Sequence, residues 1–392
     1  IYIKSNMKDK IGIFSFFAGA GFLDLGFEMN QNFQTLFVNE IHQPFMEIYQ
    51  HARKQMKIEK PEFGYSVNDI TSFLQESNLN ELKKKLQQSK ENYRYIGFIG
   101  GPPCPDFSIA GKNKGETGEN GKLSNTYTEL ICKLTPDFFL FENVKGLYRT
   151  KKHRKFFEEL KTKFRKAGYA YTERLINALD YGAPQDRERI ILIGFHQCMI
   201  DSLHMIANNG VLQDFNWNKF QKYNTESVKK LPWPETHPFV ENGITKAPKN
   251  IPIELTVQHW FNQNDVRHHP NKDQYFKPKG GLSRFQTIPE GDDKKKSYKR
   301  LHRWRYSPTA AYGNNEVHLH PYLARRLSVA EALAIQSLPK DFVLPTKDIT
   351  LSNAFKAIGN GVPFVAAEAL ANNIYDYIKL HSSITDNSNN NG

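Results

Sequence analysis

Short apolar segments alternate with segments of helical periodicity through the first half of the chain, and no other feature constrains the fold as strongly. The apolar segments are expected to be buried strands, at residues 11–17, 35–40, 95–101 and 138–144 and twice within 174–195. Between the second and third of them, Phe45, Ile48 and Tyr49 recur at helical spacing. Strands that alternate with helices form parallel sheets covered by helices on both faces. The sequence therefore predicts an α/β protein with a doubly wound, mostly parallel sheet.

The sequence changes character after Phe195. Residues 197–324 are rich in Asn, Pro, His, Trp and Lys and show little periodicity. Within them, Phe261–Tyr306 contains twelve Lys or Arg residues and five Asp or Glu residues, interleaved with aromatic residues. We expect this region to form a small, irregular, β-rich second domain.

Helical segments return over residues 325–381. Ser328 and Glu331 have the spacing of a capping box, in which each side chain bonds the backbone N–H of the other residue, so a helix is expected to begin there. A last helix follows, and residues 382–392 are expected to be a disordered, low-complexity tail. Residues 1–10 are treated as an N-terminal extension to which no function is assigned.

Composition narrows the class of protein. The chain has 392 residues, a net charge of +12 and three cysteines, at positions 104, 132 and 198. Three cysteines make no disulfide framework and no Cys-x-x-Cys pair is present, so we expect no metal site and a reducing, cytoplasmic setting. No apolar run approaches the roughly 18 residues that a membrane span needs. The positive charge favours a polyanionic partner, but charge alone leaves open whether that partner is nucleic acid.

A glycine-rich turn follows the first expected strand, in the segment FFAGAGFLDLGF at residues 16–27. Gly19 and Gly21 would let the backbone turn tightly and approach a ligand at the start of a helix. Glu40 ends the next strand, where an acid can hold the ribose hydroxyls of a nucleoside, and Asp69 lies where a third strand would end. Each of these features also fits an ordinary turn or a solvated carboxylate, so singly they leave the ligand open.

Three further groups fall at strand ends. Cys104, in Pro-Pro-Cys-Pro, follows a buried strand, and a thiolate at the carboxyl edge of a sheet is a candidate nucleophile, with a packed, unreactive cysteine as the alternative. Glu142 closes another buried strand, and acids are seldom buried without a function. Arg187 and Arg189 would share one face of a strand and could hold an anionic or carbonyl-rich substrate, with surface charge as the alternative.

Taken in order, these motifs resemble those of the DNA (cytosine-5)-methyltransferases. The matching segments are FFAGAG, NE, DI, GGPPCPDFS, ENVKGL, QDRERIILIGF, RRLSVAEALAIQSLP and AIGNGVP. The likeness covers residues 11–195 and 320–380, and a chance match of the whole ordered set is negligible. It implies a Rossmann-like, S-adenosylmethionine-dependent methyltransferase domain over residues 11–196 with a mixed, mostly parallel sheet. The helices at 325–381 would complete this domain, and residues 197–324 would be its target-recognition domain.

The resemblance also implies roles for the candidate residues. The thiolate of Cys104 would add to C6 of a cytosine flipped out of the duplex. Glu142 would hydrogen-bond N3 and the amino group of that cytosine, and Arg189, supported by Arg187, would bind the O2 side. Further substrate contacts would come from Gln185, Ser108 and Thr309.

The cofactor implied is S-adenosylmethionine, with no metal. Its contacts would be Phe17, Ala18, Gly19, Gly21, Phe22, Glu40, Ile41, Asp69, Ile70, Gly101, Pro103, Leu123, Asn360 and Val362. The chain departs from the family pattern at Gly361, where relatives often have Ser. It departs again at Pro105 and Asp106, which leaves the loop contacts that follow Cys104 open.

The polar loop from Ser108 to Gly121 would close over the DNA as a lid, with a disordered surface loop as the alternative. The basic, aromatic part of the second domain would follow phosphates and read bases. We therefore expect a monomer that methylates double-stranded DNA and protects it from a cognate restriction endonuclease. Two alternatives stay open: a tRNA cytosine-5 methyltransferase of the same fold, and a catalytically silent DNA-binding homologue. The long segment between Phe195 and Arg325 disfavours the first, and the intact Cys104, Glu142 and Arg189 disfavour the second.

Overall fold

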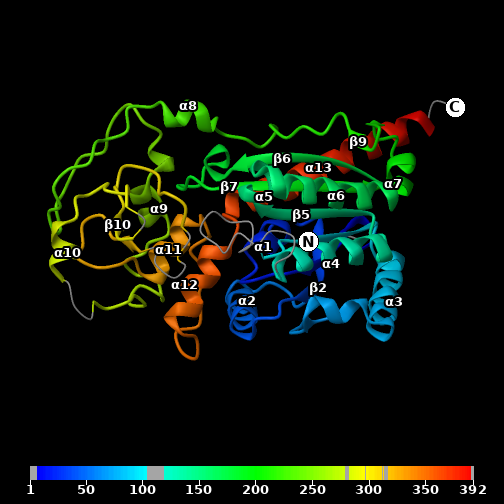
Figure 1. The fold of residues 1–392 in the computed structure, drawn as a ribbon, viewed down its shortest axis with the longest axis horizontal. Coiled ribbons are helices and arrows are strands. Elements are labelled where there is room, and N and C mark those ends of the chain that lie inside the picture. Colours follow the sequence, from blue (N-terminus) through cyan, green and yellow to red (C-terminus); the bar gives the residue numbers. More distant parts are fainter. Residues whose placement is uncertain are drawn as a thin grey trace, which may run out of the picture.

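The computed structural model describes residues 7–103, 119–278, 282–295, 297–310, 312 and 317–389. A nine-stranded sheet organises its first half (Figure 1), with the strand order β3-β2-β1-β4-β5-β7-β6-β9-β8. The strands are β1 (Ile11–Phe16), β2 (Phe33–Asn39), β3 (Tyr65–Ser66), β4 (Tyr95–Gly100), β5 (Phe138–Val144), β6 (Tyr169–Asn177), β7 (Glu188–His196), β8 (Ala207–Asn208) and β9 (Val211–Leu212). Strands β1 to β5 pair in parallel, and β7 lies antiparallel between β5 and β6. The predicted mixed, mostly parallel sheet is confirmed.

The strand order reverses between β1 and β4, which positions the site. The chain runs outward from β1 through β2 to β3 and then returns to the other side of β1 with β4 and β5. Loops on either side of such a switch point diverge and leave a crevice at the carboxyl ends of the strands. Phe16 of β1 and Gly100 of β4 are paired, so the glycine-rich turn and the Pro-Pro segment begin side by side.

Helices cover both faces of the sheet. They are α1 (Phe22–Glu28), α2 (Gln43–Gln55), α3 (Glu76–Asn92), α4 (Glu119–Leu134), α5 (Lys145–Arg149), α6 (Lys151–Lys166), α7 (Gln197–Ser202) and α13 (Phe364–Asn389), with the short 3₁₀ helices η1 (Met7–Asp9), η2 (Ile70–Leu74) and η4 (Ala178–Tyr181). Helix α12 (Leu351–Asn360) packs against α2 instead. Alternate side chains of β1 point to opposite faces of the sheet and pack in two different helical layers. Ile11 and Ile13 pack in the layer of α1 and α13, whereas Phe14 and Phe16 pack in the layer of α3, α4 and α6. No helix within the described ranges is both long enough and apolar enough to span a bilayer.

The C-terminal segment packs back on the first half of the chain. Helix α11 (Val329–Ile335) begins after Ser328, and both hydrogen bonds of the predicted capping box with Glu331 are present. Helix α13 continues to Asn389, so most of the tail that was expected to be disordered from residue 382 is helical. The tail contains no Pro and no Gly before its last residue, so no helix breaker stops α13 despite the polar composition.

The expected boundary at residue 196 is wrong in position. Strands β8 and β9 extend the large sheet, and Phe215 and Trp217 pack in the same core as α13. Phe220 also packs against that core and Lys219 pairs with Asp376 of α13, so the second part of the molecule begins after Phe220. The apolar side chains of Phe215, Trp217 and Phe220 determine this boundary, because they pack against the core that contains α13 although the surrounding sequence is irregular.

The second part contains little β structure, unlike the β-rich domain that was expected. Its described elements are α8 (Thr225–Lys229), η5 (Ile253–Leu255), α9 (Val257–Gln263), α10 (Leu282–Thr287), β10 (Lys299–Arg300) and β11 (His318–Leu319). Buried arginines bind backbone carbonyls that a sheet would otherwise pair. The Arg300 guanidinium donates to Ile288 O at 2.7 Å and His320 O at 2.5 Å, and also to Phe285 O. Such bonds satisfy the carbonyls of an irregular chain and replace a strand ladder.

Candidate active site

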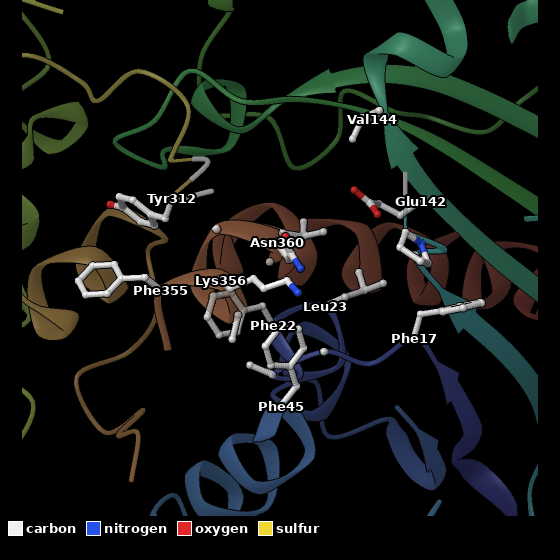
Figure 2. Close-up of a pocket in the computed structure, with 18 of the residues that line it drawn as sticks. Phe17, Phe22, Leu23, Phe45, Glu142, Val144, Tyr312, Phe355, Lys356 and Asn360 are labelled. Carbon is white, nitrogen blue, oxygen red and sulfur yellow. The ribbon is translucent and has the colours of Figure 1, made fainter. Parts of the chain in front are cut away.

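A large cleft lies at the carboxyl edge of the sheet, between the two parts of the molecule. Its volume is about 1800 Å³, and its walls come from the strand ends, from α12 and from the second part. Figure 2 shows Glu142 and Phe17 toward one end, Asn360 and Lys356 at the centre, and Tyr312 and Phe355 toward the other end. Segments far apart in sequence therefore share one cavity.

Part of the glycine-rich turn between β1 and α1 lines the cleft. Gly19 and Gly21 have φ values of 57° and 78°, in the left-handed region that glycine adopts without strain. A Cβ at Gly19 would meet no atom within 4 Å, so open space lies beside this residue. At Gly21 a Cβ would overlap the ring of Tyr49. The Arg53 guanidinium holds the turn by donating to Gly21 O at 2.6 Å and to Glu28 Oε2 at 2.6 Å.

Glu40 and Asp69 lie beside this turn. The Gly19 N–H donates to Glu40 Oε2 and the His42 N–H donates to Oε1, each at 2.8 Å, and burial raises the pKa of Glu40. Asp69 Oδ1 accepts from the backbone N–H and the hydroxyl of Thr71, each at 2.8 Å. Both acids line the cleft, with Ile41 next to them.

These residues fit a nucleoside cofactor. Ile41 is 58% exposed, which is unusual for a large apolar side chain and leaves a flat surface for a base. Glu40 supplies a carboxylate fixed by two backbone N–H groups, suited to ribose hydroxyls. The open space at Gly19 leaves room for the rest of the molecule.

A buried acid lies behind the same turn. Asp24, in α1, is 1% exposed, and burial raises its pKa to about 7, with Glu28 adding to the shift and Arg53 opposing it. The side chain borders the floor of the cleft. Its protonation therefore affects the stability of the helix on which the glycine-rich turn depends.

The substitution Asp24→Asn should change how stability depends on pH. The folded chain holds the Asp24 proton up to about pH 7, whereas an ordinary Asp releases it near 3.8. The stability from this protonated acid is therefore complete below pH 3.8 and is lost as the pH rises to about 7. Asn cannot ionise, so the variant should gain up to about 4 kcal/mol relative to the wild type across that interval. Urea unfolding of both proteins from pH 4 to 8 measures this, and a difference that stays constant with pH would contradict it.

Glu142 and Arg189 form an ion pair at the cleft. Glu142 is near the end of β5, and Arg189 near the start of the neighbouring antiparallel strand β7. Arg189 Nε lies 2.8 Å from Glu142 Oε1, and both side chains are largely buried. Burial raises the pKa of Glu142, although Arg189 and Arg187 act in the opposite direction. A Cβ at Gly101 would lie 2.5 Å from Glu142 Oε2, so glycine there leaves space for this carboxyl group.

The Pro-Pro segment that precedes Cys104 is held beside this pair. Asn143 Nδ2 donates to Pro102 O at 3.3 Å, and Gly101 and Pro103 line the cleft. The predicted nucleophile Cys104 and the predicted contact Ser108 lie outside the described residues. Pro103, the last described residue before Cys104, therefore lies in the wall of the cavity that Glu142 also lines.

A family model described as C-5 cytosine-specific DNA methylase matches residues 11–376. The chain belongs to this family. The methylase is 57% identical over 375 residues to the type II methyltransferase M.NmeDI of Neisseria meningitidis serogroup C, covering 95% of this chain and 86% of that one. It is 29% identical over 383 residues to the type II methyltransferase M.FnuDI of Fusobacterium nucleatum, covering 95% and 97%. These matches make the methylase a DNA cytosine-5 methyltransferase.

Solved structures agree on the fold. The methyltransferase EhMeth of Entamoeba histolytica superposes with a TM-score of 0.58 at 14% identity, covering 94% of the methylase and 98% of that chain. The Dnmt2 methyltransferase of S. pombe gives a TM-score of 0.58 at 11% identity, covering 94% and 99%. Their sequences are too distant to transfer the role of any residue.

Most of the expected cofactor residues border the cleft of the methylase. They are Phe17, Ala18, Gly19, Phe22, Glu40, Ile41, Asp69, Ile70, Gly101, Pro103, Leu123, Asn360 and Val362. Gly21 does not border it, because its carbonyl faces Arg53 and its α-carbon faces Tyr49. We assign Gly21 to the shape of the turn.

Three expected substrate residues bind the protein itself. Gln185 is fully buried and does not border the cleft, because its amide donates to Gln336 Oε1 at 3.0 Å and accepts from the Ala310 N–H at 2.9 Å. Arg187 lines the cleft but donates to Ala310 O and Gly359 O at 3.2 and 2.7 Å. Thr309 donates to the carbonyl of Asp186 at 2.6 Å. Gln185 is thus a structural residue that joins the two parts, contrary to its expected substrate contact.

Sequence reasoning missed Lys356, which reaches into the cleft beside Asn360 (Figure 2). Lys356 and Asn360 are four residues apart in α12 and so lie on one face of the helix. This four-residue spacing in the sequence could have placed Lys356 on the same helix face as the predicted cofactor contact Asn360. The positive charge of Lys356 acts on Glu40 across the cleft and partly opposes the rise in the pKa of Glu40 that burial causes.

The departure at Gly361 has a packing reason. A Cβ at residue 361 would overlap the ring of Phe22. Phe22 is 2% exposed and packs edge-on against Phe342 with the ring centroids 5.2 Å apart, so the ring has little freedom to move. The large Phe22 therefore requires glycine where relatives often carry serine.

The variant Gly361→Ser should lose about 1 to 3 kcal/mol of stability, because an added side chain in a packed core forces its neighbours apart. Its KM for S-adenosylmethionine should rise, since Phe22 and Val362, two of the expected cofactor contacts, line the cleft. The double variant Gly361→Ser/Phe22→Leu has room for the serine and should recover most of both losses. Thermal unfolding and methyl-transfer kinetics test this. An unaffected single variant, or a double variant no better than the single one, would refute the packing explanation.

The second part of the molecule holds fewer free cations among its described residues than its composition suggests. Arg300 and Arg303 are 0% and 5% exposed, and Arg303 binds Glu290 through Nε and Nη2, each at 2.8 Å. Arg305 donates to the carbonyls of Pro234 and Gly291. These three arginines stabilise the irregular chain, so the expectation that the whole basic segment follows phosphates is too broad.

One cluster of potential metal ligands occurs in the described part of the chain. His237, Glu290 and His302 each have a ligand atom within 4.8 Å of the others. Burial lowers the pKa of His302 to about 4, and its Nδ1 accepts the Trp304 N–H at 3.0 Å, so Nε2 carries the proton and offers no lone pair. Glu290 is already paired with Arg303. We assign these contacts to the packing of the second part.

Proposed function

We propose that the methylase transfers a methyl group to C5 of a cytosine flipped out of double-stranded DNA, through a covalent bond between Cys104 and C6. The observation that carries this is the Glu142–Arg189 pair at 2.8 Å, in the same cleft as Gly101 and Pro103. The pair offers a carboxyl group and a guanidinium, which complement the N3 and O2 edge of cytosine. Flipping is required because neither group can reach a base inside a duplex.

Cys104 makes C5 reactive in this proposal. C5 of a neutral cytosine is a poor nucleophile. When the Cys104 thiolate bonds to C6, the electron pair of the C5–C6 double bond shifts and C5 becomes enamine-like. S-adenosylmethionine, when bound, supplies a methyl group on a sulfonium that C5 can take. A base then removes the C5 proton, the C5–C6 double bond re-forms and the thiolate leaves.

Glu142 and Arg189 stabilise the charge that develops on the ring. Attack at C6 makes N3 more basic, and a protonated Glu142 can donate to it. Burial raises the pKa of Glu142 and so favours the protonated form. Arg189 is fixed by Glu142 and by the carbonyl of Glu188, to which it donates at 2.8 Å, and would hold O2. Groups positioned in advance of the reaction lose no free energy to reorganisation.

The cofactor would be held at the other side of the same cleft. Glu40 would bind the ribose hydroxyls, Ile41 and Ile70 would contact the adenine, and Asp69 would bind its amino group. Asn360 of α12 would contact the methionine end. The support is that these side chains line one cavity and that the backbone fixes both carboxylates.

A protective role beside a restriction endonuclease is part of the proposal, because both curated relatives are named type II methyltransferases. One chain would suffice as a monomer, since Glu142, Arg189 and most of the proposed cofactor residues line one cavity. Chromosomal DNA as substrate would place the methylase in the cytoplasm.

Covalent trapping tests the proposed function. A duplex containing 5-fluorocytosine cannot lose its C5 substituent as a proton, so the Cys104–C6 bond should persist after methyl transfer. With S-adenosylmethionine, the wild type should form a denaturant-resistant adduct on this duplex. No adduct on any duplex that contains 5-fluorocytosine would contradict the proposal. An adduct formed only on RNA would favour the tRNA methyltransferase alternative.

A further inference from the structure

The first turn of α6 carries cations where a helix disfavours them. Its first residues include Lys151, Lys152, Arg154 and Lys155, its first turn contains no acid, and Thr150 at the N-cap makes no side-chain capping bond. The N-terminus of a helix has a partial positive charge from its unpaired N–H groups, so it attracts anions and repels cations. This arrangement opposes the stability of the isolated helix.

Packing does not account for these cations. Helix α6 buries Phe157, Leu160 and Phe164 against the sheet, on the opposite side from Lys151 and Lys155, which are exposed. Lys161 shows what a structural lysine in this helix looks like, because it is buried and contacts Glu158 and Glu173 at 2.8 Å each. Lys151 and Lys155 form no ion pair within the described residues.

Arg154 is only partly neutralised. Its Nε lies 4.0 Å from Glu158 Oε1, and both side chains are 48% exposed. Its guanidinium also lies over the ring of Tyr148, 4.5 Å from the centroid. This ring contact fixes the direction of the side chain while the charge stays accessible to solvent.

Helix α5 joins this turn to the catalytic cleft. Lys145, its first residue, follows Glu142 by three positions and lines the cleft. Lys145 Nζ and Arg149 Nη2 contact the same carboxylate, Glu188, at 2.5 and 3.0 Å. Two cations share one acid there, so positive charge remains. Figure 1 shows α5 and then α6 leading away from the strand ends.

We propose that Lys145, Arg149, Lys151, Arg154 and Lys155, here called the α5–α6 basic surface, bind phosphates of the duplex next to the target cytosine. This rests on the proposed function, in which that cytosine reaches Glu142. A flipped nucleotide stays joined to its neighbours, and each strand carries one phosphate for about every 3.4 Å of helix axis, so phosphates of the adjoining backbone must pass the rim of the cleft. Phosphate contacts hold the duplex in register without reading its sequence.

The opposing helix dipole supports the same partner. An anion at the first turn of α6 interacts favourably both with the cations and with the unpaired N–H groups of the helix. The unfavourable arrangement in the free protein thereby becomes favourable once phosphate is bound. In the second part of the molecule, Arg300, Arg303 and Arg305 bind groups of the protein itself. Those arginines are therefore engaged, and the α5–α6 basic surface offers cations that remain accessible to phosphates.

The test compares two triple variants of the same helix. Lys151→Gln/Arg154→Gln/Lys155→Gln removes three cations from the first turn, and Lys163→Gln/Arg165→Gln/Lys166→Gln removes three exposed cations from the last turn. The first set opposes the helix dipole and the second complements it. The first variant should therefore unfold at the same or a higher temperature than the wild type, and the second at a lower temperature.

For DNA affinity we expect the opposite result, with the first-turn variant weakened and the last-turn variant unchanged. Binding to a fluorescent duplex that the wild type methylates is measured between 50 and 300 mM NaCl. The first-turn variant should bind roughly 10- to 100-fold more weakly at 0.1 M salt, and the slope of log affinity against log salt should fall by about 2 to 3, at 0.9 per lost phosphate contact. The last-turn variant should keep the wild-type affinity, slope and methylation rate.

Either of two results would overturn the inference. One is a first-turn variant with wild-type affinity and slope, and the other is an equal loss in both variants, which would show a general effect of net charge. Methyl transfer by the wild type on the same duplex is measured in parallel. If the wild type methylates and the first-turn variant binds normally, the basic surface is wrong and the proposed function stands. If the wild type transfers no methyl group to any duplex, the proposed function itself fails.

Discussion

Replacing Cys104 with serine is expected to reduce methyl transfer to DNA by at least about 10⁴-fold, the scale on which removal of an enzyme nucleophile acts. A serine hydroxyl is a far weaker nucleophile than a thiolate at neutral pH, so addition to C6 would fail. The variant should also lose the adduct with 5-fluorocytosine. Because it keeps the flanking prolines, its affinity for DNA and for S-adenosylmethionine should stay within a few-fold of the wild-type values.

The other two cysteines give matched controls. Cys132 is half-buried in α4, where burial raises its pKa to about 11, and Cys198 is exposed in α7. Neither lines the cleft. Cys132→Ser and Cys198→Ser should therefore keep wild-type rates. A Cys104→Ser protein within tenfold of the wild type would rule out this cysteine as the nucleophile.

The variant Glu142→Gln is expected to lower kcat by about 10² to 10³, the usual loss when one positioned group that stabilises transition-state charge is removed. Glutamine keeps the shape and can still accept from Arg189, but it has no acidic proton to donate to N3. Arg189 then lacks its charged partner, so thermal unfolding of the variant is measured beside its kinetics to separate a loss of stability from a loss of chemistry. A loss below about threefold would show that Glu142 has no part in the chemistry.

The pH dependence gives a second readout for Glu142. Burial raises its pKa, so the protonated form persists to higher pH than in an exposed Glu, and it declines as the pH rises further. The ratio of wild-type to Glu142→Gln rates removes the pH effects that the two proteins have in common. That ratio should rise as the pH falls from 8 to 6. A ratio that is flat or that rises with pH would contradict proton donation by Glu142.

The sheet and the strand-end groups could be predicted because they depend on local pattern. Apolar runs located β1, β4 and β5, and parallel strands end at one edge of a sheet, so Glu142 and the Pro-Pro segment had to lie near each other. The spacing of Ser328 and Glu331 likewise identified a helix start through local hydrogen bonds.

The remaining features depend on packing between distant segments. Nothing near Gln185 in the sequence indicates that its amide binds Gln336, 151 positions away. The need for Gly361 appears only when Phe22 is placed beside it. Composition counts Arg300 and a surface lysine alike, although one binds carbonyls inside the second part and the other faces solvent.

Bisulfite sequencing of DNA from cells that express the methylase tests the central claim most directly. Cytosines methylated at C5 resist conversion, so activity and target site appear together. Cells with the wild-type protein should show resistant cytosines at one recurring sequence, and cells with the Cys104→Ser variant should show none at that sequence. No resistant cytosines with the wild type, or the same pattern with the variant, would contradict cytosine-5 methylation through Cys104.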